Sequence, residues 1–198
     1  MKRMIGLLMV MGLMVGVFNG CGYLIKTHTE KYDNGKMSGE ANYIDGKKEG
    51  KYVEYYESGK VMGKGNYVNG KQEGKWVGYY ESGKVKWEDN YVDGKQDGKR
   101  VVYYESGQVR GEGNHVDGKK EGKEVHYYES GKVKGKGNYK EGNGRWVWYY
   151  ESGTVHSEGN DFVDGKEGKW AWYDENGTIT DEDIYKNGEC VEMCEGDE

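Results

Sequence analysis

A block of about 24 residues recurs through nearly the whole chain, and this internal repeat limits the folds that the chain can adopt. Each copy contains the turn Tyr-Glu-Ser-Gly or a close variant, whose glycine recurs at intervals of 22 or 24 residues, at Gly35, Gly59, Gly83, Gly107, Gly131, Gly153 and Gly177. A second turn, typically Val-Asp-Gly-Lys, follows nearly the same spacing, at Gly46, Gly70, Gly94, Gly118, Gly142, Gly165 and Gly188. We therefore expect seven copies stacked along one axis.

Each copy has the pattern of one β-hairpin. In residues 75–99, two segments rich in Val, Tyr and Trp alternate with the two glycine turns. With 35 Gly, no Pro, 19 Tyr and 6 Trp, the composition favours a thin, aromatic-rich sheet over disorder or a thick aliphatic core. The predicted fold is all-β, an elongated repeat array of stacked antiparallel β-hairpins over residues 31–189.

The side chains indicate how the first turn closes. A type I turn on Glu81 and Ser82, with Gly83 left-handed, places Tyr79 opposite Val85. This register gathers the residues that the repeats share on one face, for example Val125, Tyr127, Val133, Gly135, Gly137 and Tyr139. Glycines opposite aromatic residues leave room for rings to lie flat, so we expect this to be the packed face.

The opposite face varies from repeat to repeat. Near the C-terminal end it is predicted to carry an aromatic patch of Trp146, Trp148, Tyr150, His156, Trp170 and Trp172. Exposed aromatic patches are typical of binding surfaces, so this set is the candidate partner-binding site. The alternative is that these rings cover the last hairpins, because terminal repeats are commonly atypical.

The N-terminus has the pattern of an export signal. Residues 1–20 read as a signal peptide, with basic Lys2 and Arg3, an apolar stretch at residues 4–18 and a small residue just before Cys21. The local sequence resembles the lipobox of bacterial lipoproteins, which predicts lipidation of Cys21 and a tether over residues 21–30. Cleavage by ordinary signal peptidase and an uncleaved membrane anchor are the alternatives.

Export is compatible with the remaining cysteines. Cys190 and Cys194 form an even pair in the acidic tail, residues 190–198, and are a candidate disulfide in an oxidising compartment. Because residues four apart in a strand are about 13 Å apart, such a bond requires a turn. Two free thiols in the tail are the alternative.

Charge and motif content exclude several classes of function. Removing Lys2 and Arg3 from the formal net charge of −6 gives −8, which disfavours nucleic acid as a partner. The four histidines, His28, His115, His126 and His156, lack metal-ligand spacing. The Asp-Gly turns lack the ligand pattern of a calcium loop, and the turn serines have no partner histidine and aspartate. We expect no enzyme activity, no metal and no cofactor.

The repeat motif carries a family resemblance. Residues 74–85 read GKWVGYYESGKV, and residues 90–95 read NYVDGK. This motif resembles the MORN-repeat variant family, which includes the YwqK-type antitoxin-like proteins. The resemblance implies stacked hairpins that serve as an interaction scaffold, and it supplies no catalytic residues. Two repeats depart from the motif, with Trp87 and Asp89, or Asp181 and Asp183, in place of its glycine pair.

Two functions from different classes follow. The first is a non-enzymatic, membrane-tethered lipoprotein of the bacterial envelope, periplasmic or surface-exposed, that binds an envelope protein; an immunity-like partner is one variety. The second is a cell-wall or glycan-binding module, because the aromatic hairpins are also similar to choline-binding repeats. Those repeats carry a Gly-Trp doublet in every copy, whereas several copies here lack tryptophan. The protein-binding scaffold is therefore the leading hypothesis.

Overall fold

The computed structural model describes residues 26–162 and 165–192, which form 17 strands and no helix. The strands are β1 (Lys26–Lys31), β2 (Met37–Ile44), β3 (Lys47–Tyr55), β4 (Val61–Val68), β5 (Lys71–Tyr79), β6 (Val85–Val92), β7 (Lys95–Gln96), β8 (Gly98–Tyr103), β9 (Val109–Val116), β10 (Lys119–Lys120), β11 (Gly122–Tyr127), β12 (Val133–Lys140), β13 (Asn143–Tyr149), β14 (Val155–Phe162), β15 (Gly165–Tyr173), β16 (Ile179–Lys186) and β17 (Glu189–Glu192). The predicted all-β class is confirmed.

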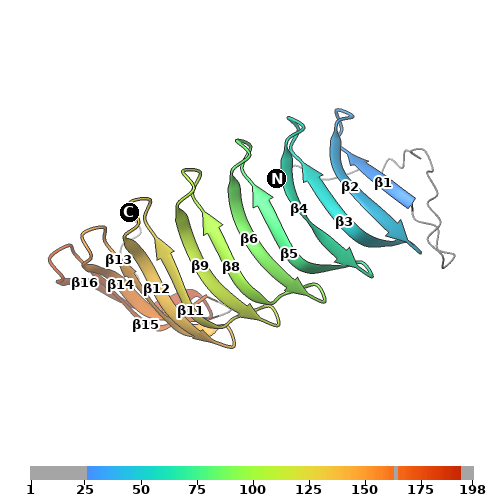
Figure 1. Ribbon diagram of the computed structural model, residues 1–198. Helices are drawn as coiled ribbons and strands as arrows, with labels where there is room; N and C mark the ends of the chain where they lie inside the picture. The colour runs from blue at the N-terminus through green and yellow to red at the C-terminus, as the bar shows by residue number, and fades with distance from the viewer. Residues whose placement is uncertain (1–25, 163–164, 193–198) are drawn as a thin grey trace.

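The strands form one open antiparallel sheet in chain order. Each long strand pairs with its neighbours in sequence, and the short strands β7 and β10 extend β8 and β11 where these pair with β6 and β9. Figure 1 shows the strands side by side in one elongated row, from β1 at one end to the C-terminal hairpins at the other. The predicted array of stacked hairpins is confirmed.

The array is longer than the sequence pattern indicated. β1 begins at Lys26 and pairs with β2 from Lys26 to Lys31, so residues 26–30 belong to the first hairpin and not to a tether. Likewise, β17 extends to Glu192, inside the predicted tail. The predicted signal peptide and Cys21 lie outside the described residues. Within those residues, no helix is long and apolar enough to cross a membrane.

Both predicted turns are present. In the first, the Tyr80 amide donates to the Lys84 carbonyl at 2.8 Å, Gly83 has a φ of +89°, and Tyr79 pairs with Val85 as expected. In the second, Asp93 and Gly94 have φ values of +52° and +84°. Two consecutive left-handed residues define a type I′ turn, whose twist matches that of the flanking strands.

A bulge next to the first turn makes the predicted face assignment wrong. After Tyr127 pairs with Val133, the register shifts, and His126 pairs with Gly135. The extra residue, Lys134, moves every later side chain of β12 to the opposite face. Gly135 and its neighbour Gly137 therefore share a face with residues of the variable set, and not with Val125 and Tyr127.

The variable face is consequently the packed one, and we call it the aromatic face. Trp76, Trp146 and Trp170 are only 5%, 3% and 3% exposed there. Each ring lies over a glycine of the preceding strand: a Cβ built on Gly137 would lie 2.1 Å from the Trp146 ring. The prediction that glycines make room for flat rings is thus correct, but the rings are these tryptophans. Full burial of a large apolar side chain contributes roughly 1.5–3 kcal/mol.

The opposite face, which we call the ion-pair face, carries cross-strand charges. Lysine or arginine on the first strand of a hairpin pairs with glutamate on the second, as in Lys75–Glu88, Lys99–Glu112, Arg145–Glu158 and Lys169–Glu182, at 2.7 to 2.9 Å. The cationic partners are well exposed, so solvent screens each pair and its contribution to stability is small. This face is solvated rather than packed.

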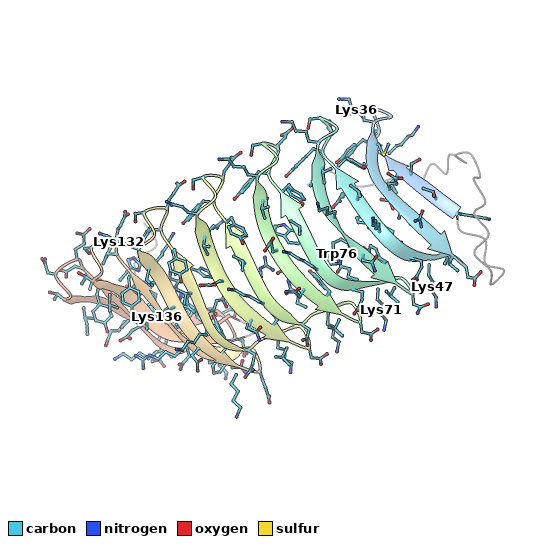
Figure 2. The ribbon with its side chains drawn as sticks, in the orientation of Figure 1. Lys36, Lys47, Lys71, Trp76, Lys132 and Lys136 are labelled. Carbon is cyan, nitrogen blue, oxygen red and sulfur yellow. The ribbon has the colours of Figure 1, made fainter. Side chains whose placement is uncertain are left out.

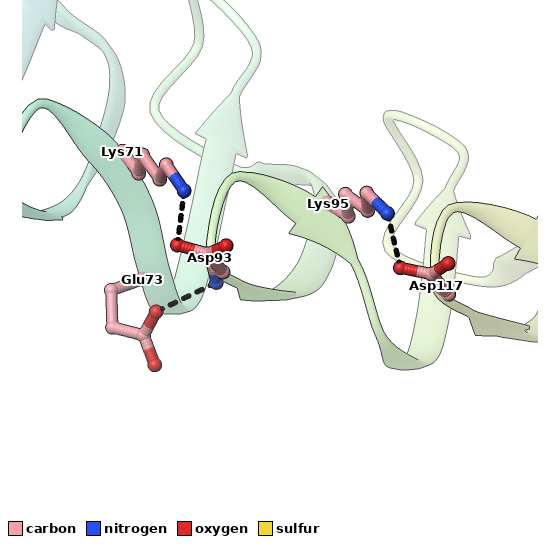
Figure 3. A network of polar contacts seen from close by, with 5 residues as sticks. All are labelled: Lys71, Glu73, Asp93, Lys95 and Asp117. Atoms are coloured by element: carbon pink, nitrogen blue, oxygen red, sulfur yellow. Dashed lines mark hydrogen bonds and ion pairs between the residues drawn. The ribbon is translucent and has the colours of Figure 1, made fainter.

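Hydrogen bonds at both edges join each repeat to the next. At the Tyr-Glu-Ser-Gly edge, a tyrosine hydroxyl donates to a backbone carbonyl of the following repeat at 2.5 to 2.7 Å, from Tyr32, Tyr56, Tyr80, Tyr104, Tyr128 and Tyr150. At the Asp-Gly edge, the Asp93 amide donates to the Glu73 carboxylate at 3.0 Å, and Lys71 pairs with Asp93 at 2.5 Å (Figure 3). These bonds explain why the repeats keep these residues.

Candidate functional site

The aromatic face begins with a cluster of rings on β2 to β6. Ala41, Tyr52 and Trp76 are buried, and the half-buried residues packed against them are Tyr43, Tyr67, Trp87 and Tyr91. The centroid of the Tyr67 ring lies 5.2 Å from that of Trp76, edge to face. Figure 2 places Trp76 between the two edges of the array, with Lys36 at one edge and Lys71 at the other.

A second cluster lies on β12 to β16. Tyr139, Trp146 and Trp170 are buried, and Trp148, Trp172 and Tyr185 are half-buried against them. The Tyr139 hydroxyl donates to the Asp161 carboxylate at 2.6 Å, and burial together with this bond raises the pKa of Tyr139. In this C-terminal cluster, three residues are therefore fully packed, while the rings of Trp148, Trp172 and Tyr185 remain partly accessible.

The predicted aromatic patch is only partly present as an exposed surface. Trp146 and Trp170 are buried, so the prediction that they are exposed is wrong; the bulge places them on the packed face. Trp148 and Trp172 are half-buried and remain available for contact.

The other two members of the predicted patch lie at the edge. His156 is the bulge residue of β14, and its ring centroid lies 4.8 Å from that of Tyr150. The Tyr150 hydroxyl donates to the Tyr173 carbonyl at 2.7 Å, so this tyrosine joins two repeats. The binding role of the patch remains a prediction, now confined to Trp148 and Trp172.

Between the two aromatic clusters lies a charged cavity of about 330 Å³, which we call the central pocket. Its wall includes Arg100, Arg110, His115, Lys120, Glu124 and His126. Glu124 accepts hydrogen bonds from His126 at 2.9 Å and pairs with Lys120 at 3.2 Å. Arg100 reaches Asp89 at 3.5 Å, outside normal hydrogen-bond distance.

The pKa shifts around the central pocket reflect burial and the charges of neighbouring side chains. Burial alone would raise the pKa of Glu124, but His126 and Lys120 bring it below its ordinary value. Burial, with the nearby Arg100 guanidinium, lowers the pKa of His115. Burial raises the pKa of Asp89, against the opposing influence of Arg100. Glu124 is therefore charged and His115 neutral near pH 7.

The central pocket was not predicted from the sequence. His115 was considered there only as a metal ligand, and Arg100, Lys120 and Glu124 were not among the predicted site residues. One feature of the sequence does indicate the pocket. This repeat retains the glycine pair, Gly111 and Gly113, but the facing positions, which hold tryptophan in other repeats, hold His126 and Glu124. In the part of the chain that the structure describes, no group of His, Cys, Asp and Glu could hold a metal ion.

The C-terminal cysteines are described in part. Cys190 lies on β17, opposite Tyr185, and is disulfide-bonded. Cys194 lies outside the described residues, so its pairing with Cys190 remains a prediction.

Comparison with known proteins identifies one family. The family model described as the MORN repeat variant matches seven segments, residues 26–45, 48–69, 72–93, 96–117, 120–141, 143–161 and 166–187. No curated protein matches the chain.

Likeness to solved structures is weak. A crystal structure of a GtfA/B complex bound to UDP and GlcNAc shares 10% identity at a TM-score of 0.19, covering 71% of this chain and 24% of that chain. A crystal structure of accessory secretory protein 1,2 and 3 in Streptococcus pneumoniae shares 15% identity at a TM-score of 0.20, covering 62% of this chain and 18% of that chain. The chain thus spans less than a quarter of each matched chain, and neither likeness supports a functional conclusion.

Proposed function

The chain belongs to the MORN repeat variant family, and from this premise we propose that it is a non-enzymatic scaffold that holds a protein partner on its aromatic face. The observation that carries the proposal is the contrast between the surfaces. The ion-pair face and the two edges repeat the same contacts in most hairpins, whereas the aromatic face changes from hairpin to hairpin. Repeat arrays commonly bind through the surface that varies over a constant frame.

Trp148 and Trp172 are the proposed anchors for the partner. Both are half-buried, and they rest on the buried rings of Trp146 and Trp170, at centroid distances of 5.2 and 6.1 Å. Because the buried rings hold each tryptophan in place, little side-chain entropy is lost on binding. Tryptophans of this kind often contribute most of the binding energy.

A protein partner fits these rings better than a glycan. Sugar rings stack on open aromatic faces, but the deepest tryptophans of both clusters are buried, and Lys166 lies over the rings of Trp172 and Tyr185 at 4.7 and 4.5 Å. Lys166 therefore covers part of the ring surface on which a sugar would stack. Binding of cell-wall glycan is therefore the second candidate, and the experiment below distinguishes it.

We also propose that the scaffold is held at the bacterial envelope by a lipid on Cys21. The basic, apolar and Gly-Cys order of residues 1–21 supports this proposal. More than one acyl chain is required for lasting attachment. Fatty-acid labelling of the chain should be lost in Cys21→Ser, and labelling that persists unchanged would contradict the anchor. An immunity-like role, with an envelope toxin as partner, is one variety of this scaffold.

Crosslinking and pull-down from envelope extracts tests the proposed surface. Trp148→Ala and Trp172→Ala should each release the partner, because truncating a central aromatic anchor often costs 2 kcal/mol or more, roughly 30-fold in affinity. Tyr149→Ala is the matched control: it is the next residue along β13, but it belongs to the ion-pair face, where Lys136 lies over its ring at 5.1 Å.

Three outcomes are distinct. Loss of one captured protein with an unchanged melting temperature supports the scaffold. Loss of stability with every partner retained means that these tryptophans only cover the last hairpins. Release of glycan fragments in place of a protein supports the glycan-binding candidate.

A further inference from the structure

The central pocket exists because two tryptophan positions are filled by smaller side chains. In the C-terminal cluster, Trp148 and Trp146 lie over Gly135 and Gly137, and a Cβ on either glycine would lie within 2.6 Å of a ring. In the central repeat, His126 and Glu124 face Gly111 and Gly113. A Cβ built on either glycine would lie 3.0 to 3.1 Å from the nearest atom of the facing side chain. The missing ring volume leaves the cavity open.

The hydrogen-bonding groups that remain available in the central pocket include the guanidinium donors of two arginines. Arg100 makes only the 3.5 Å contact with Asp89, and within residues 26–162 and 165–192 Arg110 has no hydrogen-bond partner. His115 is also without one, and its Nδ1 is buried. Both oxygens of Glu124 are already occupied by His126 and Lys120.

The charge of the wall sets the charge of the ligand. Arg100, Arg110 and Lys120 line the pocket together with the carboxylates of Glu112 and Glu124. Outside the lining, Asp89 pairs with Arg100, and Lys99 of the ion-pair face pairs with Glu112. The arginine, lysine and carboxylate side chains together leave an excess of one positive charge. A singly charged oxyanion balances this excess, whereas a phosphate dianion would leave the pocket with a net negative charge.

We propose that the central pocket binds a carboxylate, held mainly by the guanidinium groups of Arg100 and Arg110. Arginine forks match the two oxygens of a carboxylate, and charge-assisted hydrogen bonds are about twice as strong as neutral ones. That the carboxylate comes from an acidic side chain of the protein partner rests on the proposed function. Binding of a small carboxylate probe to the pocket does not depend on the proposed function. An experiment can therefore contradict one of the two proposals without contradicting the other.

Proton NMR of the histidine rings tests the pocket directly. The probe is the peptide acetyl-Gly-Glu-Gly-amide, titrated into the purified full-length chain at constant pH, and its neutral counterpart acetyl-Gly-Gln-Gly-amide is the control. The ring signals of His115 and His126 should shift saturably with the Glu peptide only. His28 and His156, outside the central pocket, serve as internal references. Equal shifts with the Gln peptide, or at all four histidines, would overturn the proposal.

Two variants and a second anion sharpen the test. Arg100→Met should weaken binding of the Glu peptide about tenfold or more, while Arg145→Met, which removes an arginine of the ion-pair face, should leave it unchanged. Inorganic phosphate should bind more weakly than the Glu peptide. Unchanged binding to Arg100→Met, or tighter binding of phosphate, would contradict the carboxylate assignment.

His126→Trp separates loss of the pocket from loss of the fold. The new ring should lie over Gly111 as Trp148 lies over Gly135, and it should close the cavity while keeping or raising the melting temperature. The His115 signal should then no longer respond to the Glu peptide. A folded His126→Trp chain that binds the peptide as the parent does would place the site elsewhere.

Discussion

At the residue scale, glycine and tryptophan act as a pair across neighbouring strands. Gly137 has Trp146 against it so closely that no side chain fits between them, and Gly65 and Gly159 have the same relation to Trp76 and Trp170. The glycines are therefore part of the core even though they add no apolar surface. Their role is to let a ring lie flat on the backbone of the preceding strand.

We predict that Gly137→Ala destabilises the array by about 1–3 kcal/mol, because the new Cβ would lie 2.1 Å from the Trp146 ring. Gly63→Ala is the matched control, since its Cβ would meet nothing closer than 3.7 Å and its φ is not left-handed. There the stability should stay the same or rise by up to about 1 kcal/mol. The free energy of unfolding in urea measures both. Equal losses in the two variants would mean that Trp146 does not pack on Gly137.

At the element scale, each hairpin depends on the next through its edges. The ladder of tyrosine hydroxyls and the Asp-Gly ladder join each repeat to the next at regular steps. Figure 3 shows two successive contacts of the Asp-Gly ladder, Lys71–Asp93 and Lys95–Asp117. In a linear array, such contacts between neighbours set the cooperativity of unfolding.

We predict that Tyr56→Phe lowers the free energy of unfolding by about 0.5–1.5 kcal/mol, because its hydroxyl donates to the Tyr79 carbonyl at 2.6 Å. Tyr55→Phe is the control, since in the described residues that hydroxyl donates no hydrogen bond; its effect should stay within about 0.5 kcal/mol. Chemical denaturation followed by circular dichroism measures both. A larger loss in Tyr55→Phe than in Tyr56→Phe would show that the edge ladder does not couple the repeats.

The sequence predicted the hairpins and turns but not the faces, and the reason lies in one residue per repeat. The glycine period and the Asp-Gly dipeptides determine turn geometry locally, so they are readable from the sequence. The bulge residues, such as Lys134 and His156, carry no distinctive side chain. Because a shift of one residue exchanges the two faces of a strand, missing the bulge reversed the packed face and misplaced the tryptophans.

At the scale of the whole molecule, one face serves two purposes. Buried rings such as Trp146 and Trp170 hold the array together, and the half-buried Trp148 and Trp172 above them are the proposed contact with a partner. The central pocket interrupts this face between two aromatic clusters. A partner that follows the array would therefore meet rings at both ends and donors in the middle.

Hydroxyl-radical footprinting of the free and partner-crosslinked chain tests this account most directly. In the free chain, Trp148 and Trp172 should react readily while Trp146 and Trp170 react little. On capture of the partner, Trp148 and Trp172 should become protected, while Tyr149 on the ion-pair face keeps its reactivity. If Trp146 reacts as fast as Trp148 in the free chain, or if protection is confined to Tyr149 and its face, the central claim is contradicted.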